Sequence, residues 1–227
     1  MSSAYSKKVL DHGRVELINW MGDDLFIVQA AQSSFGKLSS SYGDREKKIL
    51  RSLIREEHGV PFEHTVLSYR IKMPIFVARQ LVKHRISSWS EHSGRYSAME
   101  PEFYVPQTIR TQIGKPMEYL YQNADENLTN YAYDRISRSN QAAWDEYLDL
   151  MAVGVAKEQA RLVLPTTLYT TITWTLNVRS LLNVLHLRTD PHAQAETQQF
   201  AWTMELLAEN VIPDTLVAFN QNGRKAP

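Results

Sequence analysis

Residues 83–95 read Lys83-His84-Arg85-Ile86-Ser87-Ser88-Trp89-Ser90-Glu91-His92-Ser93-Gly94-Arg95, a concentration of cations, imidazoles and hydroxyls around one glycine. Burying so many hydrogen-bonding groups is costly unless an anionic partner satisfies them. Arginine offers forked donors that match a phosphate, and a glycine lets such a ligand approach the backbone closely. The pattern therefore predicts an anion-binding loop. A solvated surface loop with a few ion pairs is the alternative that these residues alone leave open.

Two other chemistries use residue types found in and near this loop. Serine, histidine and glutamate could form a hydrolase triad, but the sequence has no nucleophile-elbow motif. The histidines could bind a metal, but none stands in a His-Glu-x-x-His arrangement and the chain contains no cysteine. His58 and His64 flank the turn at Pro61, so they do not share a helical face. We therefore expect no metal site.

The composition is that of one globular domain. The chain has 227 residues, 43% of them hydrophobic, with 25 basic and 25 acidic side chains. We expect a single domain over residues 1–227, with flexible tails at about 1–6 and 221–227. Zero net charge argues against a nucleic-acid partner. The sequence lacks a signal-peptide core and a run of about 20 apolar residues, so we expect no membrane partner and a cytoplasmic protein, in a host cytoplasm if the chain is viral.

Periodic patterns divide the chain into strands scattered among longer helices. Alternating and β-branched segments predict strands at residues 15–20, 67–73 and 166–174. Helical periodicity predicts helices at residues 22–31, 44–58, 74–84, 156–162, 177–187 and 192–210, and two more within 118–153 separated by a break at 137–140. Asp44 is expected to cap the second helix and Pro74 to open the third. This mixture predicts an α+β domain.

The helix predicted at residues 177–187 carries a polar stripe. Arg179, Asn183 and His186 recur at helical spacing, i, i+4 and i+7, opposite an apolar face. An ordinary solvent face favours Lys, Glu and Gln, because Asn lowers helix stability by up to about 0.7 kcal/mol relative to Ala. We therefore interpret Asn177, Asn183 and Arg188 as donors for a ligand. A plain solvent-facing stripe is the alternative.

Together these segments resemble the flavin-dependent thymidylate synthases. The family's signature is Arg-His-Arg-x-x-Ser-x-Asn-Glu-x-Ser-x-Arg, and residues 83–95 match six of its eight fixed positions. Further blocks similar to the family's follow in order, at residues 58–64, 74–80, 160–165 and 177–183. The resemblance extends from about residue 34 to residue 219.

The resemblance implies reductive methylation of dUMP to dTMP. Methylenetetrahydrofolate would supply the one-carbon unit, and NADPH would supply hydride through bound FAD. The other class of thymidylate synthases activates uracil with a cysteine thiolate, which this chain cannot do because it has no cysteine. The flavin-dependent family needs no enzyme nucleophile, since the cofactor carries that chemistry. The family's fold is a small, mostly antiparallel sheet packed with several helices, and its homotetramer builds each site from several subunits.

The resemblance assigns roles position by position. The residues that it implies at FAD are Ser34, His58, Glu63, Lys83, His84, Arg85, Ile86, Asn177, Arg179 and Asn183. The residues that it implies at dUMP are Gln80, Glu91, Ser93, Gly94, Arg95, Arg161 and Arg188. Arg188 would lie at the uracil, where a cation stabilises negative charge on the pyrimidine carbonyls, and Glu91 and Arg95 complete the catalytic set. Ser93 would bind phosphate and would not act as a nucleophile.

Three positions depart from the family pattern. Lys83 keeps the charge of an arginine but loses its forked geometry. Ser90 replaces an asparagine and so lacks an amide donor, and Val60 stands where a hydroxyl residue is common. Because Glu91 and Arg188 are retained, we expect activity with looser flavin binding.

Three rival interpretations stay open. The departures could mark a sensor or scaffold that binds dUMP without forming dTMP. The cations of residues 83–95 could contact nucleic acid, although zero net charge disfavours this. A flavin enzyme of the same fold could use another methyl acceptor, although the retained pyrimidine-nucleotide set disfavours that interpretation.

Overall fold

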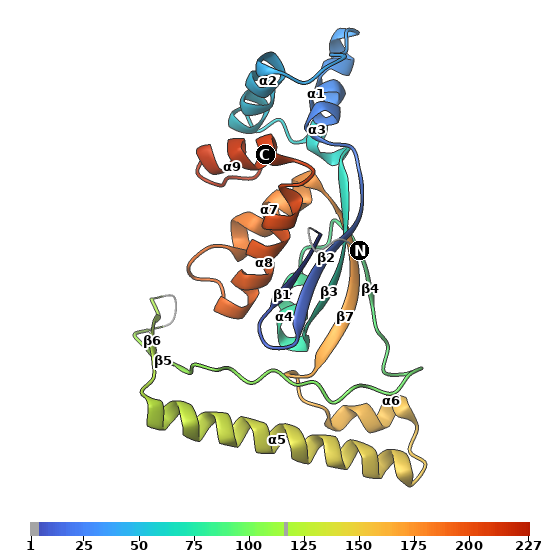
Figure 1. Ribbon diagram of the computed structural model, residues 1–227, viewed down its shortest axis with the longest axis vertical. Coiled ribbons are helices and arrows are strands. Elements are labelled where there is room, and N and C mark those ends of the chain that lie inside the picture. The colour runs from blue at the N-terminus through green and yellow to red at the C-terminus, as the bar shows by residue number, and fades with distance from the viewer. Residues whose placement is uncertain (1–4, 116–117) are drawn as a thin grey trace. The chain divides into compact units, whose positions relative to one another are not determined.

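The computed structural model describes residues 5–115 and 118–227, which fold into two compact units (Figure 1). Of these residues, 5–92 and 170–227 form the larger unit, and 93–115 and 118–169 form the smaller unit. The single domain expected from the composition stays a prediction, as do the flexible tails. Of the amino-terminal tail, residues 1–4 lie outside the described residues, whereas Ser6 begins the first strand.

A five-stranded sheet organises the larger unit, in the order β1-β2-β3-β7-β4. The strands are β1 (Ser6–Val9), β2 (Gly13–Met21), β3 (Val66–Pro74), β4 (Ser88–Glu91) and β7 (Tyr169–Asn177). The pairs β1–β2, β2–β3 and β4–β7 are antiparallel. The alternation seen in the sequence becomes a buried face, on which Val15 lies opposite Ile71 and Leu17 opposite Tyr69.

The helices of the larger unit supply the rest of its core. They are α1 (Asp24–Gln32), α2 (Asp44–Arg55), α3 (Val60–Glu63), α4 (Ile75–Leu81), α7 (Val178–Arg188), α8 (Ala195–Ala208) and α9 (Pro213–Gln221), with a short 3₁₀ helix η2 (Ser33–Phe35). Helix α8 packs against β1 and β2 and runs beside α7 (Figure 1). Leu181, Leu182 and Leu185 of α7 are fully buried in this core, which leaves the polar face of α7 free to line a site.

The smaller unit is built around one long helix. Its elements are β5 (Arg110–Ile113), β6 (Leu120–Asn123), α5 (Glu126–Ala152), α6 (Lys157–Ala160) and a 3₁₀ helix η3 (Arg161–Val163). Only Asn140 and Tyr147 of α5 are buried. Oδ1 of Asn140 accepts a 2.7 Å hydrogen bond from the hydroxyl of Thr167, and the hydroxyl of Tyr147 accepts one of 3.4 Å from the backbone N–H of Met99.

The observed fold confirms the α+β class and the small, mostly antiparallel sheet, and it corrects several boundaries. Two helices were expected within 118–153. The structure instead has the strand β6 followed by one unbroken helix, α5. Asp125 starts that helix by accepting a hydrogen bond from the backbone N–H of Leu128 at 2.8 Å. No break occurs at 137–140, because the side chain of Asn140 is bonded to Thr167 and does not compete with the helix backbone.

Other corrections concern caps and an additional helix. The N-cap of α2 is Gly43, and Asp44 is the first helical residue; Glu46 satisfies the backbone N–H of Gly43 at 3.1 Å. The strand expected at 166–174 occupies residues 169–177. Helix α9, which begins at Pro213, was not predicted. Within residues 5–115 and 118–227, every helix is too short or too polar to cross a lipid bilayer.

Candidate active site

A cavity of about 680 Å³ lies within the larger unit, and its size is typical of ligand-binding sites. Its lining comes from the end of α3, the loop between α4 and β4, the end of β7, the length of α7, and the carboxy-terminal residues. The lining residues are Glu63, Lys83, His84, Arg85, Ile86, Ser87, Trp174, Leu176, Asn177, Arg179, Ser180, Asn183, Leu187, Arg188, Ala226 and Pro227. Four of these side chains are cations and one is a carboxylate, so the first cavity favours an anionic ligand.

Helix ends position the polar side chains of this first cavity. The side chain of Asn177 caps α7 by accepting a 2.8 Å hydrogen bond from the backbone N–H of Ser180. The loop after α4 is closed by the hydroxyl of Ser87, which donates to the carbonyl oxygen of His84 at 2.8 Å. The anion-binding loop expected from the sequence is therefore split, because its second part forms the strand β4 (Ser88–Glu91), which pairs with β7.

Arg179 connects the first cavity with a second one. Its Nη1 donates to Oε1 of Glu63 at 2.6 Å, and its Nε donates to the main-chain oxygen of Pro227 at 2.9 Å. A Cβ added at Gly59 would lie 2.4 Å from Nε of Arg179, so the absence of a side chain at Gly59 makes room for the guanidinium. Arg179 is thus held at the boundary of both cavities.

Arg188 ends α7 and is paired with an imidazole. Its Nε donates a 3.1 Å hydrogen bond to Nε2 of His84. Burial, followed by the charge of Arg188, lowers the pKa of His84 to about 4. Burial also lowers the pKa of Arg188. His84 is therefore neutral near pH 7, and Arg188 carries the positive charge of the pair.

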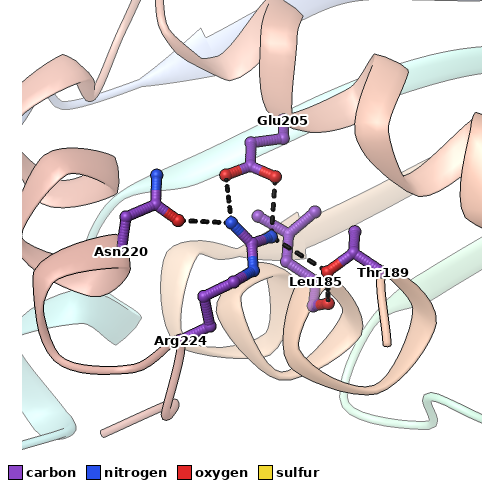
Figure 2. A network of polar contacts seen from close by, with 5 residues as sticks. All are labelled: Leu185, Thr189, Glu205, Asn220 and Arg224. Carbon is purple, nitrogen blue, oxygen red and sulfur yellow. Dashed lines mark hydrogen bonds and ion pairs between the residues drawn. The ribbon is translucent and has the colours of Figure 1, made fainter. Parts of the chain in front are cut away.

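A partly buried polar network fixes the segment that follows α7 (Figure 2). Nη1 and Nη2 of Arg224 bind the two carboxylate oxygens of Glu205 at 2.9 and 2.7 Å. Nη2 of Arg224 also donates at 3.0 Å to the hydroxyl of Thr189, which itself donates to the carbonyl oxygen of Leu185 at 2.6 Å. Nη1 of Arg224 contacts Asn220 as well. The network joins the ends of α7, α8 and α9 through Thr189, the residue that follows Arg188 in the chain.

A second cavity of about 970 Å³ lies between α1, α2 and α3 of the same unit. Its lining residues are Ala31, Gln32, Ser34, Phe35, Lys37, Arg45, Ile49, Leu53, Glu57, His58, Gly59, Val60, Pro61 and Arg179. The two cavities share Arg179. Val60 is 63% exposed there, so a hydroxyl residue at this position would be open to a ligand.

The comparisons with known proteins agree with each other. The family described as Thymidylate synthase complementing protein matches residues 16–214. Proteins described as flavin-dependent thymidylate synthases are 42% identical in Kosmotoga olearia and 41% identical in Thermosipho africanus, each over 93% of this chain and 92% of the relative. The solved structure of a UMP/dUMP methylase, PolB from Streptomyces cacaoi bound with 5-Br UMP, is similar with a TM-score of 0.88 and 34% identity, covering 97% of this chain and 99% of that chain.

This chain belongs to the flavin-dependent thymidylate synthase family. The match to the family covers most of both compact units. The family, the fold and the thymidylate synthase activity expected from the sequence are thereby confirmed.

The residues expected at the flavin of this synthase fall into the two cavities. Eight of the ten line the first cavity: Glu63, Lys83, His84, Arg85, Ile86, Asn177, Arg179 and Asn183. The other two, Ser34 and His58, line the second cavity. Arg179 belongs to both cavities, so it is the point at which the two groups meet within one chain. Their contacts with a flavin stay a prediction.

The residues expected at dUMP are divided between the two units of the synthase. In the larger unit, Arg188 lines the first cavity and Glu91 ends β4. Nε2 of Gln80 donates to the side chain of Gln194 at 2.5 Å, and Oε1 of Gln80 accepts from the hydroxyl of Thr197 at 3.1 Å. The amide of Gln80 is therefore held from both sides.

The remaining dUMP residues form a group within the smaller unit. The hydroxyl of Ser93 accepts a 3.3 Å hydrogen bond from the backbone N–H of Arg95. Nε of Arg95 donates to Oε2 of Glu158 at 3.2 Å, and both side chains are about half exposed. A Cβ at Gly94 would lie 3.2 Å from Cδ of Arg161, so Gly94 lets Arg161 approach the loop. The structure thus brings Ser93, Gly94, Arg95 and Arg161 together.

Sequence reasoning missed several lining residues of the first cavity. Trp174 and Leu176 of β7 line this cavity, and so do Ala226 and Pro227 at the end of the chain. The alternation along β7 could have indicated the first two. Nothing local in the sequence places the last two residues beside α7, because that contact depends on the fold of α9.

The residues of the first cavity fit a flavin cofactor. Its cations suit a diphosphate, and Asn177 and Asn183 supply amide groups of the kind that bind a ring carbonyl or a ribose. Nε1 of Trp174 is buried and, among the described residues, has no hydrogen-bond partner. A buried donor without a partner is costly unless a ligand accepts from it.

Proposed function

We propose that this synthase methylates dUMP to dTMP, taking the one-carbon unit from methylenetetrahydrofolate and reducing equivalents from NADPH through FAD. The observation that supports this most directly is the first cavity. It gathers eight of the ten residues expected at the flavin, together with Arg188, in a lining that has four cations and one carboxylate. The relatives' description as flavin-dependent thymidylate synthases supports the same activity.

The first cavity would hold the flavin through its cations and amides. Lys83, Arg85 and Arg179 would bind the negatively charged part of the cofactor, and Asn177 and Asn183 would bind neutral polar groups. When bound, the flavin supplies the hydride transfer that a reductive methylation requires. The protein contributes binding, orientation and the exclusion of water.

The phosphate of the nucleotide would be held by a group within the smaller unit. Ser93, Arg95 and Arg161 offer a hydroxyl and two guanidinium groups of the kind that bind a phosphate. Arg95 is paired with the exposed carboxylate of Glu158, an interaction weak enough for a phosphate to replace. Arg188 would stabilise negative charge that develops on the pyrimidine carbonyls. Glu91 would contact the same nucleotide.

No cysteine is available as a nucleophile in this chain. The oxygen of Ser93 accepts a hydrogen bond from the backbone N–H of Arg95, which leaves its O–H able to donate to a phosphate, the role expected for it. This supports a reaction without covalent attachment of the substrate to the enzyme. Activation of the pyrimidine would come from the charge of Arg188.

We also propose a homotetramer with sites shared between subunits. Helix α5 is 27 residues long, and only two of them are buried. Its exposed apolar residues include Leu128, Tyr131, Tyr133 and Leu148. Ser34 and His58 lie in a different cavity from the other expected flavin residues, which favours a site completed by a second copy of the chain.

The test is a turnover assay without oxygen, because dioxygen drains reduced flavin. Purified protein would receive FAD, NADPH, methylenetetrahydrofolate and dUMP, and dTMP would be followed by mass spectrometry. We expect dTMP formation that requires both FAD and NADPH. A parallel reaction with UMP is informative because the similar protein from Streptomyces cacaoi is described as a UMP/dUMP methylase. We expect dUMP to be the better substrate.

Failure to form dTMP, despite measured binding of dUMP and FAD, would contradict the proposal. It would favour a nucleotide-binding sensor, and Lys83→Arg with Ser90→Asn would then be the variant to assay. Methylation of UMP alone would instead show a different methyl acceptor on the same fold.

A further inference from the structure

In the first cavity the guanidinium of Arg188 is paired with an imidazole, that of His84. The hydrogen bond runs from Nε of Arg188 to Nε2 of His84 at 3.1 Å, and both side chains line the first cavity. Within residues 5–115 and 118–227, Arg188 has no ion pair with a carboxylate. The outer nitrogens of Arg188, Nη1 and Nη2, are therefore not committed to an anion of the protein itself.

The choice of an imidazole as the partner has a chemical consequence. A carboxylate at the same place would orient the guanidinium but would also offset its charge. A neutral imidazole accepts one hydrogen bond and leaves the charge of Arg188 uncompensated for a ligand. Because Nε2 accepts, the ring proton of His84 lies on Nδ1.

We propose that His84 is a positioning residue, which orients Arg188 toward the pyrimidine through this hydrogen bond without neutralising it. The effect on turnover rests on the proposed function. The pairing itself is a property of the chain without any ligand, so the two can be tested separately.

Hydrogen bonds of the adjoining chain segments hold both His84 and Arg188 in place. The backbone N–H of His84 donates to the carbonyl oxygen of Leu81 at 3.0 Å, and its carbonyl oxygen accepts from Ser87 at 2.8 Å. Arg188 is followed by Thr189, which is bound by Arg224 in the network of Figure 2. The imidazole and the guanidinium therefore meet between two anchored helix ends, which is what precise orientation requires.

Burial, together with the positive charges nearby, keeps the imidazole of His84 neutral. Protonation would place a donor opposite the Nε–H of Arg188 and so abolish the hydrogen bond. The charged groups that line the first cavity besides Arg188 are Lys83, Arg85, Arg179 and Glu63, and three of these four are cations. Burial and the Arg188 charge lower the pKa of His84 to about 4, so the pair persists over the whole neutral range.

The pairing is tested on the ligand-free chain by NMR of protein with ¹⁵N-labelled histidine. We expect His84 to show the Nδ1–H tautomer and to titrate near pH 4, and we expect its midpoint to move upward in Arg188→Met. His186→Phe, on the same helix but outside both cavity linings, should leave the signal of His84 unchanged. A midpoint near the ordinary value of about 6.5 in the wild type, or no shift in Arg188→Met, would overturn the inference.

The positioning role is tested by a double-mutant cycle in the turnover assay at saturating FAD. We expect His84→Phe to lower kcat by about 10- to 100-fold with a much smaller change in KM for dUMP. His84→Gln should recover part of this loss, because its amide oxygen can accept from Arg188. In an Arg188→Lys background, His84→Phe should cost less than about threefold, since its effect passes through Arg188.

Fully additive losses in this cycle would overturn the positioning role, as would a His84→Phe enzyme with unchanged kcat. Circular dichroism and flavin titration of each variant separate unfolding and weak cofactor binding from misorientation. If the wild type forms no dTMP, the proposed function fails, and the NMR titration still decides whether His84 holds Arg188.

Discussion

Gly59 has helical backbone angles, φ −72° and ψ −32°, so only the space beside it limits which side chain it tolerates. A Cβ there would lie 2.4 Å from Nε and 2.6 Å from Cζ of Arg179. The far end of Arg179 can move away at little cost, and we therefore expect Gly59→Ala to keep the stability of the fold. The displaced guanidinium leaves both cavities altered, and we expect flavin affinity to fall by about tenfold, the worth of one charge-assisted hydrogen bond.

The matched control is Gly43→Ala, where an added Cβ meets nothing closer than Oε2 of Glu46 at 3.7 Å. Its flavin dissociation constant, measured by fluorescence quenching, should equal that of the wild type. An equal affinity of Gly59→Ala and wild type would show that Arg179 does not contact the cofactor.

Lys83 lines the first cavity where the family signature has an arginine. An arginine would restore forked donors, and we expect Lys83→Arg to tighten flavin binding by about 3- to 10-fold. The measurement is a flavin titration under the same conditions as for Gly59→Ala. Lys8→Arg on strand β1, outside the cavity linings, is the control. Unchanged or weaker binding would mean that Lys83 does not face the cofactor.

The pH dependence of stability follows from the lowered pKa of His84. Between about 6.5 and about 4, the unfolded chain binds a proton at His84 and the folded chain does not. The free energy of unfolding that His84 contributes is therefore present above this window and is lost as pH falls through it. We expect the wild type to lose stability relative to His84→Phe between pH 6.5 and 4 in urea unfolding. Parallel curves for the two proteins would contradict the assigned shift.

For single residues, the sequence predicted the site residues best where they form a recognisable motif. The spacing of Arg179, Asn183 and His186 predicted a shared polar face of the helix, and the structure places the first two in the lining of one cavity, whereas His186 lines neither cavity. The imidazole partner of Arg188 was not predictable. His84 and Arg188 are far apart in the chain, and their contact depends on how α4 and α7 end in the fold.

Among the elements, the ends of α7, α8 and α9 are joined by Arg224 (Figure 2). Glu205 is 6% exposed in its side chain, so removing Arg224 would leave a nearly buried carboxylate unpaired. We expect Arg224→Met to lower the free energy of unfolding by about 3 kcal/mol. Chemical unfolding at pH 7 measures this change.

The companion variant removes the orphaned charge. Glu205→Gln in the Arg224→Met background should recover part of the loss, since an amide costs less to bury than a carboxylate. As a surface comparison, Asp134→Ala breaks the exposed pair with Arg138 and should cost less than about 0.5 kcal/mol. A loss in Arg224→Met as small as that in Asp134→Ala would show that the network is not a stabilising one.

Element boundaries were predicted best where local chemistry decides them. The alternation of β3 and the apolar face of α7 gave the right elements, because burial follows the period of the backbone. The break expected at residues 137–140 was wrong, since Asn140 is satisfied by Thr167 from outside the helix. The residues of β6 were predicted to be helical. They form a strand because they pair with β5, and the pattern within β6 itself does not show this pairing.

On the scale of the whole molecule, α5 bears on assembly. Leu128 and Tyr131 are 40% and 65% exposed, and they stand three residues apart on the helix. We expect light scattering to give the mass of four copies of the 26.1 kDa chain. Leu128→Glu with Tyr131→Glu should give smaller species and at least about tenfold lower turnover, because charges would be buried in the interface.

Asn127→Glu with Asn130→Glu adds the same charge to the same helix at exposed polar positions and should leave the tetramer intact. A wild-type chain that scatters as a monomer and still forms dTMP would contradict shared sites.

The most direct test of the site assignment is a crystal structure of the chain with FAD and dUMP. We expect the flavin against Lys83, Arg85, Asn183 and Arg179, with Nε of Arg188 still bonded to His84 and its outer nitrogens facing the pyrimidine. The same structure would show whether Ser93, Arg95 and Arg161 bind the nucleotide phosphate. A flavin bound away from the first cavity, or a carboxylate paired with Arg188 in the complex, would contradict the account.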